Sequence, residues 1–399
     1  MNQGTIIAGC GVVTAIGLDA ASCLDALSHG RDGIGDMRRL VSAHRGLLPV
    51  AEVPRTNEEL AAMAGLPGCI NRTALLSAVA AQEALRDAGI HSLKGFRSGF
   101  ISANTVGGMD STEDFFHEYM KDHDGGRLRQ VLHHECGSVT DLVAELLGVS
   151  DHVTTISTAC SSSANAIFHA ARLIRAGMLD IAIAGGADAL VRFTLNGFNT
   201  LMILDAEPCR PFDDERHGLN LGEGAGYVVL LSDAAAATLG ARTDVRLTGY
   251  CNANDAYHQT ASSPEGTGSF LAMQGALRMS GLEPGEISYI NLHGTGTQNN
   301  DVAEGTAIAR LFGNDAPPMS STKSFTGHTL GASGGVEAVF SVLAIRHGLM
   351  FPNLRFRQRM KELPFSPLTE FRQNVKVSHV LSNSFGFGGN CSSLIFSAA

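Results

Sequence analysis

One order of patterns occurs twice along the chain. A short apolar run, a helix of small residues and a second apolar run surround residue 160, and the same order surrounds residue 334. In each half a glycine-rich turn then leads into a last apolar run, at 222–231 and again at 386–396. Because strands alternate with helices, we expect an α/β architecture in which helices cover mixed sheets.

The long repeat indicates a duplicated domain, with one half at 1–240 and the other at 241–399. The small and polar residues at 234–244 suit a seam between the halves. A duplicated fold places equivalent loops around one central crevice. We therefore expect four features to meet there: Cys160, His293, His328 and the turn at 385–389.

A cysteine lies at the corner between a predicted strand and a predicted helix. Residues 153–156 form a β-branched run, and residues 159–176 carry apolar side chains at helical spacing before Gly177 ends the helix. Cys160 thus lies at a helix N-terminus, where free N–H groups and the helix dipole favour a thiolate. From this stretch alone, both a nucleophile and an inert packed cysteine remain open.

Periodicity predicts most other elements. Further helices are expected at 20–28, 72–88, 138–147, 267–280, 301–311 and 334–347, and further strands at 5–14, 98–102, 180–184, 227–231, 245–249, 287–292, 376–381 and 391–397. Residues 30–70 are expected to be irregular. The G-x-G-x-G run at 222–226 precedes a strand and opens no helix, which argues against a dinucleotide-binding fold.

Composition excludes several classes. The 399 residues carry a net charge of −10, which argues against general nucleic-acid binding, and no apolar run reaches the roughly 18 residues of a membrane span. The polar start at 1–5 argues against a signal peptide. Eight scattered cysteines without a C-x-x-C pair argue against a disulfide framework or zinc site and favour a cytoplasmic setting. The H-H-E-C run at 133–136 suggests metal ligation only weakly, because adjacent side chains point apart.

Four motifs follow one another at wide separations: T-A-C-S-S at 158–162, H-G-T-G-T at 293–297, Lys323 with Gly-His at 327–328, and G-F-G-G at 386–389. Together they resemble the elongating β-ketoacyl-acyl-carrier-protein synthases among the thiolase-like condensing enzymes. The resemblance extends over nearly the whole chain. It implies a thiolase-like α/β fold whose duplicated halves form five layers, α-β-α-β-α.

The resemblance also implies a reaction. Cys160 would take an acyl group from a carrier-protein thioester, and a malonyl-carrier would then lose carbon dioxide and attack the acyl group. His293 and His328 would hydrogen-bond the thioester carbonyl, and Lys323 would support the site electrostatically. The backbone N–H groups of Cys160 and Phe387 would form the oxyanion hole.

Further roles follow from the same resemblance. The implied substrate-binding residues are Thr295 and Thr297 for the phosphopantetheine arm, Phe385 and Phe387 as a gate, and Gly388. The implied supporting acids are Asp301, Glu304 and Glu337. Each has a plainer explanation, since threonines cap turns, phenylalanines fill cores, and lone histidines and lysines are usually structural.

No catalytic metal or bound cofactor is expected, because phosphopantetheine would arrive on the carrier protein. Glu337 lies in an apolar helix, and a buried acid needs a partner. The resemblance implies a structural monovalent cation held by five residues: Asn291, Leu292, Glu337, Ser382 and Asn383.

The chain departs from the family pattern after the glycine turn. The usual Gly-Thr-Asn is replaced by Asn390-Cys391-Ser392, and serines fill 161–163. These features resemble the synthases of aryl-polyene pigment clusters and favour growth of flat, rigid polyene chains over saturated fatty-acid chains.

Other functions compete with an elongating synthase. A non-catalytic chain-length factor would lack the cysteine, an initiating synthase would use Cys-His-Asn, and a papain-like hydrolase has no role for a second histidine. A coenzyme A-dependent thiolase needs a second catalytic cysteine, and Cys391 keeps that alternative open.

The resemblance further implies an acidic acyl carrier protein as partner. It implies a dimer, either a homodimer or a heterodimer with a chain-length-factor-like subunit. The candidate docking cations are Arg38, Arg39, Lys121, Arg127 and Arg129.

Overall fold

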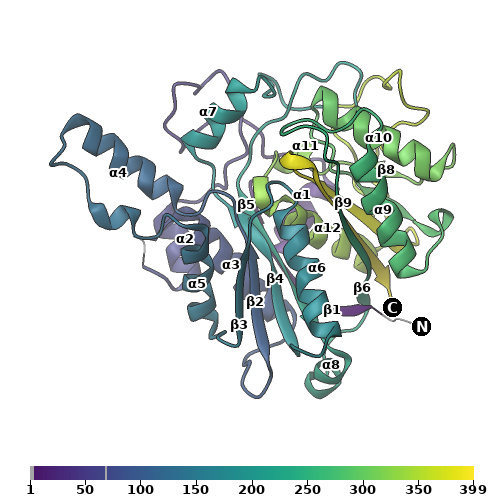
Figure 1. The fold of residues 1–399 in the computed structure, drawn as a ribbon, viewed down its shortest axis with the longest axis horizontal. Helices are drawn as coiled ribbons and strands as arrows, with labels where there is room; N and C mark the ends of the chain where they lie inside the picture. The colour runs from purple at the N-terminus through teal and green to yellow at the C-terminus, as the bar shows by residue number, and fades with distance from the viewer. Residues whose placement is uncertain (1–3, 68–69) are drawn as a thin grey trace.

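The structure is a computed structural model that describes residues 4–67 and 70–399. Within these residues one ten-stranded mixed sheet runs through the molecule in the order β3-β2-β4-β5-β1-β6-β10-β9-β7-β8 (Figure 1). The strands are β1 (Thr5–Thr14), β2 (Ser98–Ala103), β3 (His152–Ile156), β4 (Ile181–Asp188), β5 (Gly224–Leu231), β6 (Val245–Asn254), β7 (Tyr289–Asn291), β8 (Met319–Ser320), β9 (His379–Phe385) and β10 (Asn390–Ala398).

The two halves of the sheet repeat one pattern of pairing. β1 pairs antiparallel with β5 and β5 antiparallel with β4, whereas β4, β2 and β3 run parallel. In the second half β6, β10 and β9 repeat the antiparallel part, and β9, β7 and β8 repeat the parallel part. β1 and β6 join the halves through a short antiparallel pairing. Since the sheet crosses this junction, a domain boundary after residue 240 stays a prediction.

Helices cover both faces of each half of the sheet. They are α1 (Ala20–Ser28), α2 (Asn57–Ala64), α3 (Arg72–Asp87), α4 (Met109–Lys121), α5 (Cys136–Leu147), α6 (Ser162–Arg175), α7 (Arg192–Thr200), α8 (Asp233–Leu239), α9 (Thr267–Ser280), α10 (Gln298–Phe312), α11 (Lys323–Thr326) and α12 (Ser333–His347).

Three hydrophobic cores define the layers. One lies between the first half of the sheet and the outer helices α3 and α5, and another lies between the second half and α9 and α10. The third surrounds α6 and α12, which lie between the two halves (Figure 1). The predicted five-layered α-β-α-β-α arrangement is confirmed, because small residues on α6 and α12 let both half-sheets pack on one central layer.

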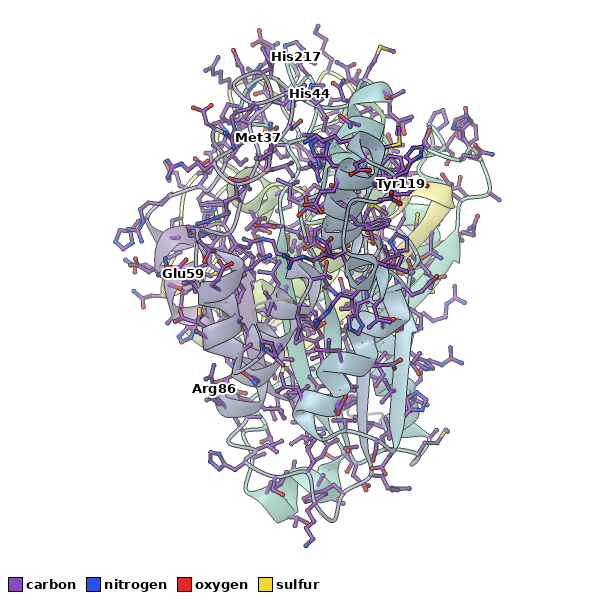
Figure 2. All side chains as sticks on the ribbon, turned by 90° about the vertical axis from the view of Figure 1, so that its left-hand side faces the viewer. Met37, His44, Glu59, Arg86, Tyr119 and His217 are labelled. Carbon is purple, nitrogen blue, oxygen red and sulfur yellow. The ribbon has the colours of Figure 1, made fainter. Side chains whose placement is uncertain are left out.

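The region predicted to be irregular contains a helix. Thr56 caps α2 with a capping box in which Glu59 bonds back to the Thr56 backbone, and Gly65 ends the helix with φ +68°. Glu59 marks this helix in Figure 2. The eight-residue helix buries Leu60 on its inner face, and its signal lies in the caps because it is too short for a strong periodic pattern.

Two further segments differ from the sequence-based expectation. The presumed seam contains the short helix α8, and the polar segment after residue 108 forms α4, an arm that protrudes from the first half (Figure 1). Figure 2 views this arm from outside, with Tyr119 labelled on it. The last predicted turn is shorter than expected, because β9 continues to Phe385 in register with β10.

Gly226 on β5 marks the closest approach of α12 to the sheet. A Cβ atom there would lie 2.3 Å from the backbone nitrogen of Val336, so backbone would have to move. We expect Gly226→Ala to lower the unfolding free energy by about 1–3 kcal/mol, measured by urea denaturation. Gly285→Ala, which meets nothing within 4 Å, is the control. Equal effects of the two substitutions would contradict this role of Gly226.

Candidate active site

Cys160 lies on a strained corner between β3 and α6. The preceding Ala159 has φ +53°, a left-handed conformation that is uncommon for a residue with a side chain. The cysteine is buried, with 6% of its surface exposed. The turn after β9 lies against this corner, because a Cβ on Gly386 would lie 3.2 Å from the Cys160 nitrogen.

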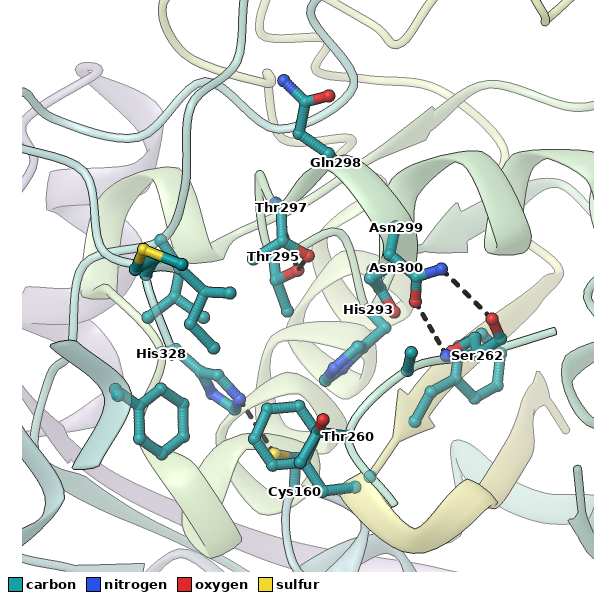
Figure 3. Close-up of a pocket in the computed structure, with 18 of the residues that line it drawn as sticks. Cys160, Thr260, Ser262, His293, Thr295, Thr297, Gln298, Asn299, Asn300 and His328 are labelled. Carbon is teal, nitrogen blue, oxygen red and sulfur yellow. Dashed lines mark hydrogen bonds between the residues drawn. The ribbon is translucent and has the colours of Figure 1, made fainter. Parts of the chain in front are cut away.

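Two histidines face the cysteine from the second half of the chain (Figure 3). His328 Nε2 lies 3.0 Å from the sulfur of Cys160, and His328 Nδ1 lies 2.9 Å from the Ser333 hydroxyl. The His293 ring is almost perpendicular to that of His328, with centroids 5.5 Å apart. The structure therefore brings Cys160, His293 and His328 together as predicted.

Lys323 contacts both the backbone and the ring of His293. Its ammonium group donates to the His293 carbonyl at 2.6 Å and lies 3.3 Å from Nδ1 of that ring. It also forms a buried ion pair with Glu337, whose other carboxylate oxygen lies 3.5 Å from the Ser384 hydroxyl. Lys323 and Glu337 are each 2% exposed, so Lys323 supplies the partner that the buried acid needs.

The other two acids hold the backbone of the histidine turn. Glu304 accepts the N–H groups of His293 at 2.9 Å and Gly294 at 2.8 Å. Asp301 accepts the Gly296 N–H at 3.2 Å and lies 3.7 Å from Arg216. Both acids therefore orient the residues that contact the cavity.

The cysteine and both histidines line one cavity of about 220 Å³. Thr295 and Thr297 line it with their hydroxyls 2.8 Å apart (Figure 3). Phe385 packs against His293, with ring centroids 5.8 Å apart, and Phe387 also lines the cavity. These four residues share the cavity with Cys160, and their role in substrate binding stays a prediction.

Gly388 does not belong to this set. It is absent from the cavity wall, and its N–H already donates to the Gln259 carbonyl at 2.7 Å. Its φ of +81° shows what the glycine does: it lets the turn reverse between its two neighbours, which do line the cavity. The substrate-binding role of Gly388 stays a prediction.

Sequence reasoning missed several residues of the site. Phe198 on α7 stacks on Phe387 at 5.6 Å and meets the His328 ring edge-on at 6.5 Å. Asp188 at the end of β4 accepts the Gly331 N–H at 2.7 Å and so fixes the loop after His328. The polar wall opposite comes from two short segments, 260–262 and 298–300. None of these residues belongs to a motif, and only the tertiary structure brings them to the cavity.

Burial has the largest effect on the pKa values of the cysteine and the two histidines. Desolvation raises the pKa of the Cys160 thiol to about 11, although Lys323 and the backbone N–H groups of Phe387 and Cys160 act in the opposite direction. The expectation that the helix N-terminus favours a thiolate is therefore wrong, because burial outweighs it. Desolvation, followed by the charge on Lys323, holds the pKa values of His293 and His328 well below their ordinary value. The resting site thus holds a neutral thiol and two neutral imidazoles.

The raised pKa of Cys160 predicts how its reactivity changes with pH. Alkylation of Cys160 by iodoacetamide is expected to accelerate by about tenfold per pH unit between pH 6 and 9, because the reactive thiolate remains a minority throughout that range. Peptide mass spectrometry of the labelled site gives the rate, and Cys160→Ala gives the background. A plateau beginning near pH 6 would contradict this account, since it would indicate a thiolate–imidazolium pair.

The proposed cation residues lie together behind the site. Asn291 and Ser382 are paired neighbours on β7 and β9. The buried Asn291 Oδ1 has no hydrogen-bond partner among the described residues, so this acceptor fits a hard cation. The Asn383 side chain is already used, bonding Glu304 and Ser393. Asn383 could therefore bind a cation only through its backbone carbonyl. Leu292 has no polar side chain and could likewise bind a cation only through its backbone carbonyl. Among the described residues, no group of three or more His, Cys, Asp or Glu side chains could hold a metal, and this includes His133 and its neighbours.

Comparisons with known proteins agree with this geometry. The model of the β-ketoacyl synthase N-terminal domain matches residues 4–236, and that of the C-terminal domain matches residues 245–357. The 3-oxoacyl-[acyl-carrier-protein] synthase 2 of Staphylococcus aureus (strain COL) is 32% identical, covering 99% of this chain and 98% of that protein.

Two solved structures are similar over the full chain. The ishigamide ketosynthase/chain length factor has a TM-score of 0.94 and 30% identity, covering 100% of both chains. The ketosynthase ApeO of Xenorhabdus doucetiae, in complex with its chain length factor ApeC, has a TM-score of 0.86 and 32% identity. That match covers 100% of this chain and 98% of the other.

A five-layered duplicated fold with a buried cysteine and two histidines in one cavity defines a thiolase-like condensing enzyme. Within that class, the chain belongs to the β-ketoacyl synthase family.

Proposed function

We propose that this protein catalyses the decarboxylative Claisen condensation of malonyl-acyl-carrier-protein with an acyl group held on Cys160. The observation that carries the proposal is the placement of the Cys160 sulfur 3.0 Å from His328, with His293 on the other side of one cavity. The product is a β-ketoacyl-carrier thioester two carbons longer than the acyl group.

The first half-reaction loads the enzyme. The Cys160 sulfur attacks the thioester carbonyl, and the N–H groups of Cys160 and Phe387 stabilise the oxyanion. The carbon–sulfur bond to the carrier breaks, and the carrier's phosphopantetheine leaves as a thiol with the proton that Cys160 gives up. Since burial keeps that thiol protonated, the adjacent neutral His328 Nε2 is placed to accept the proton during attack.

The second half-reaction forms the carbon–carbon bond. The malonyl carboxylate leaves as carbon dioxide, and its electron pair forms an enolate whose oxygen accepts hydrogen bonds from N–H groups of His293 and of His328, the latter in its neutral Nε2–H tautomer. The enolate carbon attacks the acyl carbonyl, and the bond from that carbonyl to the Cys160 sulfur breaks. The Cys160 thiolate then takes up one proton from solvent, which balances the loss of the malonyl carboxylate as carbon dioxide. Lys323 holds the His293 carbonyl and ring in place throughout.

The competing functions have less support. A non-catalytic chain-length factor needs no cysteine in this cavity. A thiolase would need Cys391 beside Cys160, but Cys391 is buried on β10, 3.9 Å from the Ser269 hydroxyl, and does not line the cavity. Among the described residues, Cys160 is therefore the cysteine that lines this cavity, and the thiolase alternative lacks its second one.

We propose that the working form is a dimer, either a homodimer or a heterodimer with a chain-length-factor-like subunit. The structural relatives include ketosynthases with a chain length factor. β3 lies at the edge of the described sheet, and large apolar side chains on the protruding arm are exposed: Phe116, Tyr119, Met120, Leu128 and Leu132.

The carrier protein is proposed to bind near the candidate docking cations. Arg127 and Arg129 line a surface depression beside α4, whereas Arg38 and Arg39 lie together with their backbone N–H groups bonded to Glu52. Lys121 ends the α4 arm. No helix within the described residues is long and apolar enough to cross a membrane. The described cysteines form no disulfide, which supports a reducing, cytoplasmic setting.

The residues that depart from the family pattern support a polyene substrate. Asn390, Cys391 and Ser392 follow the glycine turn in place of the usual Gly-Thr-Asn, and serines fill 161–163. We therefore also propose that the enzyme prefers a conjugated acyl chain to a saturated one.

Turnover tests the reaction and the preference together. The protein is incubated with malonyl-carrier and with acyl-carriers bearing saturated or conjugated chains of equal length, and both carbon dioxide and carrier-bound products are quantified. One carbon dioxide per β-ketoacyl product, with faster conversion of conjugated chains, is expected. Equal rates would remove the polyene preference alone, and the absence of product with every chain would remove the proposed reaction.

A further inference from the structure

One side-chain oxygen beside the nucleophile accepts three hydrogen bonds. Asn390 Oδ1, at the start of β10, accepts from the Ser161 hydroxyl at 2.7 Å, from Asn165 Nδ2 at 2.9 Å and from Asn252 Nδ2 at 2.7 Å. Ser161 directly follows Cys160 and is fully buried, and Asn165 lies in the first turn of α6. The Asn390 side chain is therefore bonded to the segment that carries the nucleophile.

The backbone of the same residue closes the opposite turn. The Asn390 carbonyl accepts the Gly386 N–H at 2.8 Å, across the turn that carries Phe387. Asn390 thus binds two separate segments, one through its side chain and the other through its backbone. These segments supply the two proposed oxyanion donors, the N–H groups of Cys160 and Phe387.

The surroundings make this link stiff. Asn252 Nδ2 also donates to the Ser392 hydroxyl at 2.8 Å, and Ser392 donates to Asn165 Oδ1. Asn165 Nδ2 in turn donates to the Thr158 hydroxyl at 2.8 Å, on the other side of Cys160. Because oxyanion donors must be held within about 0.5 Å of their productive positions, such a network affects how well the hole stabilises the oxyanion.

We propose that Asn390 is a positioning residue that sets the spacing of the two oxyanion donors. This inference rests on the proposed function, because it assumes that acyl transfer to Cys160 passes through that hole. It assigns a role to one of the residues by which this chain departs from the family pattern. The decarboxylation step depends instead on His293 and His328, so the two steps should respond differently to a change at residue 390.

The test separates these two steps. Asn390→Leu keeps the side-chain volume and removes the acceptor. Acylation of Cys160 by an acyl-carrier, followed by intact-mass spectrometry, is expected to slow by about 10- to 50-fold, less than the roughly 10²–10³-fold loss of a whole donor. Decarboxylation of malonyl-carrier, followed as carbon dioxide release, is expected to stay within about threefold of the wild-type rate.

A second variant controls for the loss of an asparagine side chain that accepts hydrogen bonds away from the nucleophile. Asn71 caps α3 through its side-chain oxygen, and Asn71→Leu should change both rates by the same small factor. Ser161→Ala removes one of the hydrogen-bond donors to Asn390. It takes the place of Asn390→Leu in the test if that variant does not fold. It should slow acylation selectively but less strongly.

The outcomes distinguish this inference from the proposed function. The positioning role would be overturned if Asn390→Leu lowered the rates of acylation and decarboxylation equally. An unchanged acylation rate would overturn it too. If Asn390→Leu does not fold, the same criteria apply to Ser161→Ala. A wild-type protein that forms no acyl adduct would overturn the proposed function and this inference with it.

Discussion

Cys160→Ala is expected to lower the rate of condensation at least about 10³-fold while leaving the folded structure unchanged. The substitution removes the atom that holds the acyl group between the two half-reactions. Alanine fits the site because the cysteine is already a small, buried side chain. Product formation from acyl-carrier and malonyl-carrier gives the rate, and thermal unfolding reports the fold.

Cys391→Ala is the matched control for this substitution. It also removes a buried thiol, but one that lies on β10 and does not line the cavity. We expect its condensation rate to stay within about threefold of the wild-type rate. A loss at Cys391 as large as that at Cys160 would restore the thiolase alternative.

Lys323→Met is expected to lower the unfolding free energy by about 3–5 kcal/mol at pH 8, because it leaves the buried Glu337 carboxyl without its partner. Urea denaturation measures the change. Lys323→Met/Glu337→Leu removes both charges and is expected to recover most of the lost stability. A double variant as unstable as the single one would show that Lys323 stabilises through other contacts.

The deficit of Lys323→Met should also depend on pH. In the wild-type protein burial raises the pKa of Glu337 to about 7 against the opposing charge of Lys323. Removing that charge raises the pKa further. A carboxyl whose folded-state pKa exceeds its unfolded value is stabilising when protonated and loses this contribution as the pH rises. The deficit should therefore shrink as the pH falls from the variant's higher Glu337 pKa towards about pH 7 and level off below it. A deficit that grew on acidification would contradict the burial of an uncompensated carboxylate.

The motifs anticipated which residues lie together in the cavity, because each of these residues is held by a short segment with its own signal. Cys160 follows a strand and precedes a small-residue helix, and His293 and His328 each lie beside glycines. The five-layered fold was equally predictable, since the same order of strands and helices occurs twice.

What sequence could not supply was contact between distant segments. Lys323 and Glu337 were each assigned a role, but their ion pair depends on how α11 and α12 are packed. Phe198 carries no motif and reaches the cavity only through the placement of α7. The direction of the Cys160 pKa was wrong because a helix N-terminus is visible in sequence, whereas the depth of burial is not.

The central claim is that Cys160 carries the acyl group during catalysis, and intact-mass spectrometry after incubation with acyl-carrier tests it most directly. The account predicts a mass increase equal to one acyl group, localised to Cys160, absent in Cys160→Ala and discharged when malonyl-carrier is added. An adduct that persists in Cys160→Ala, or one that malonyl-carrier does not discharge, would contradict it.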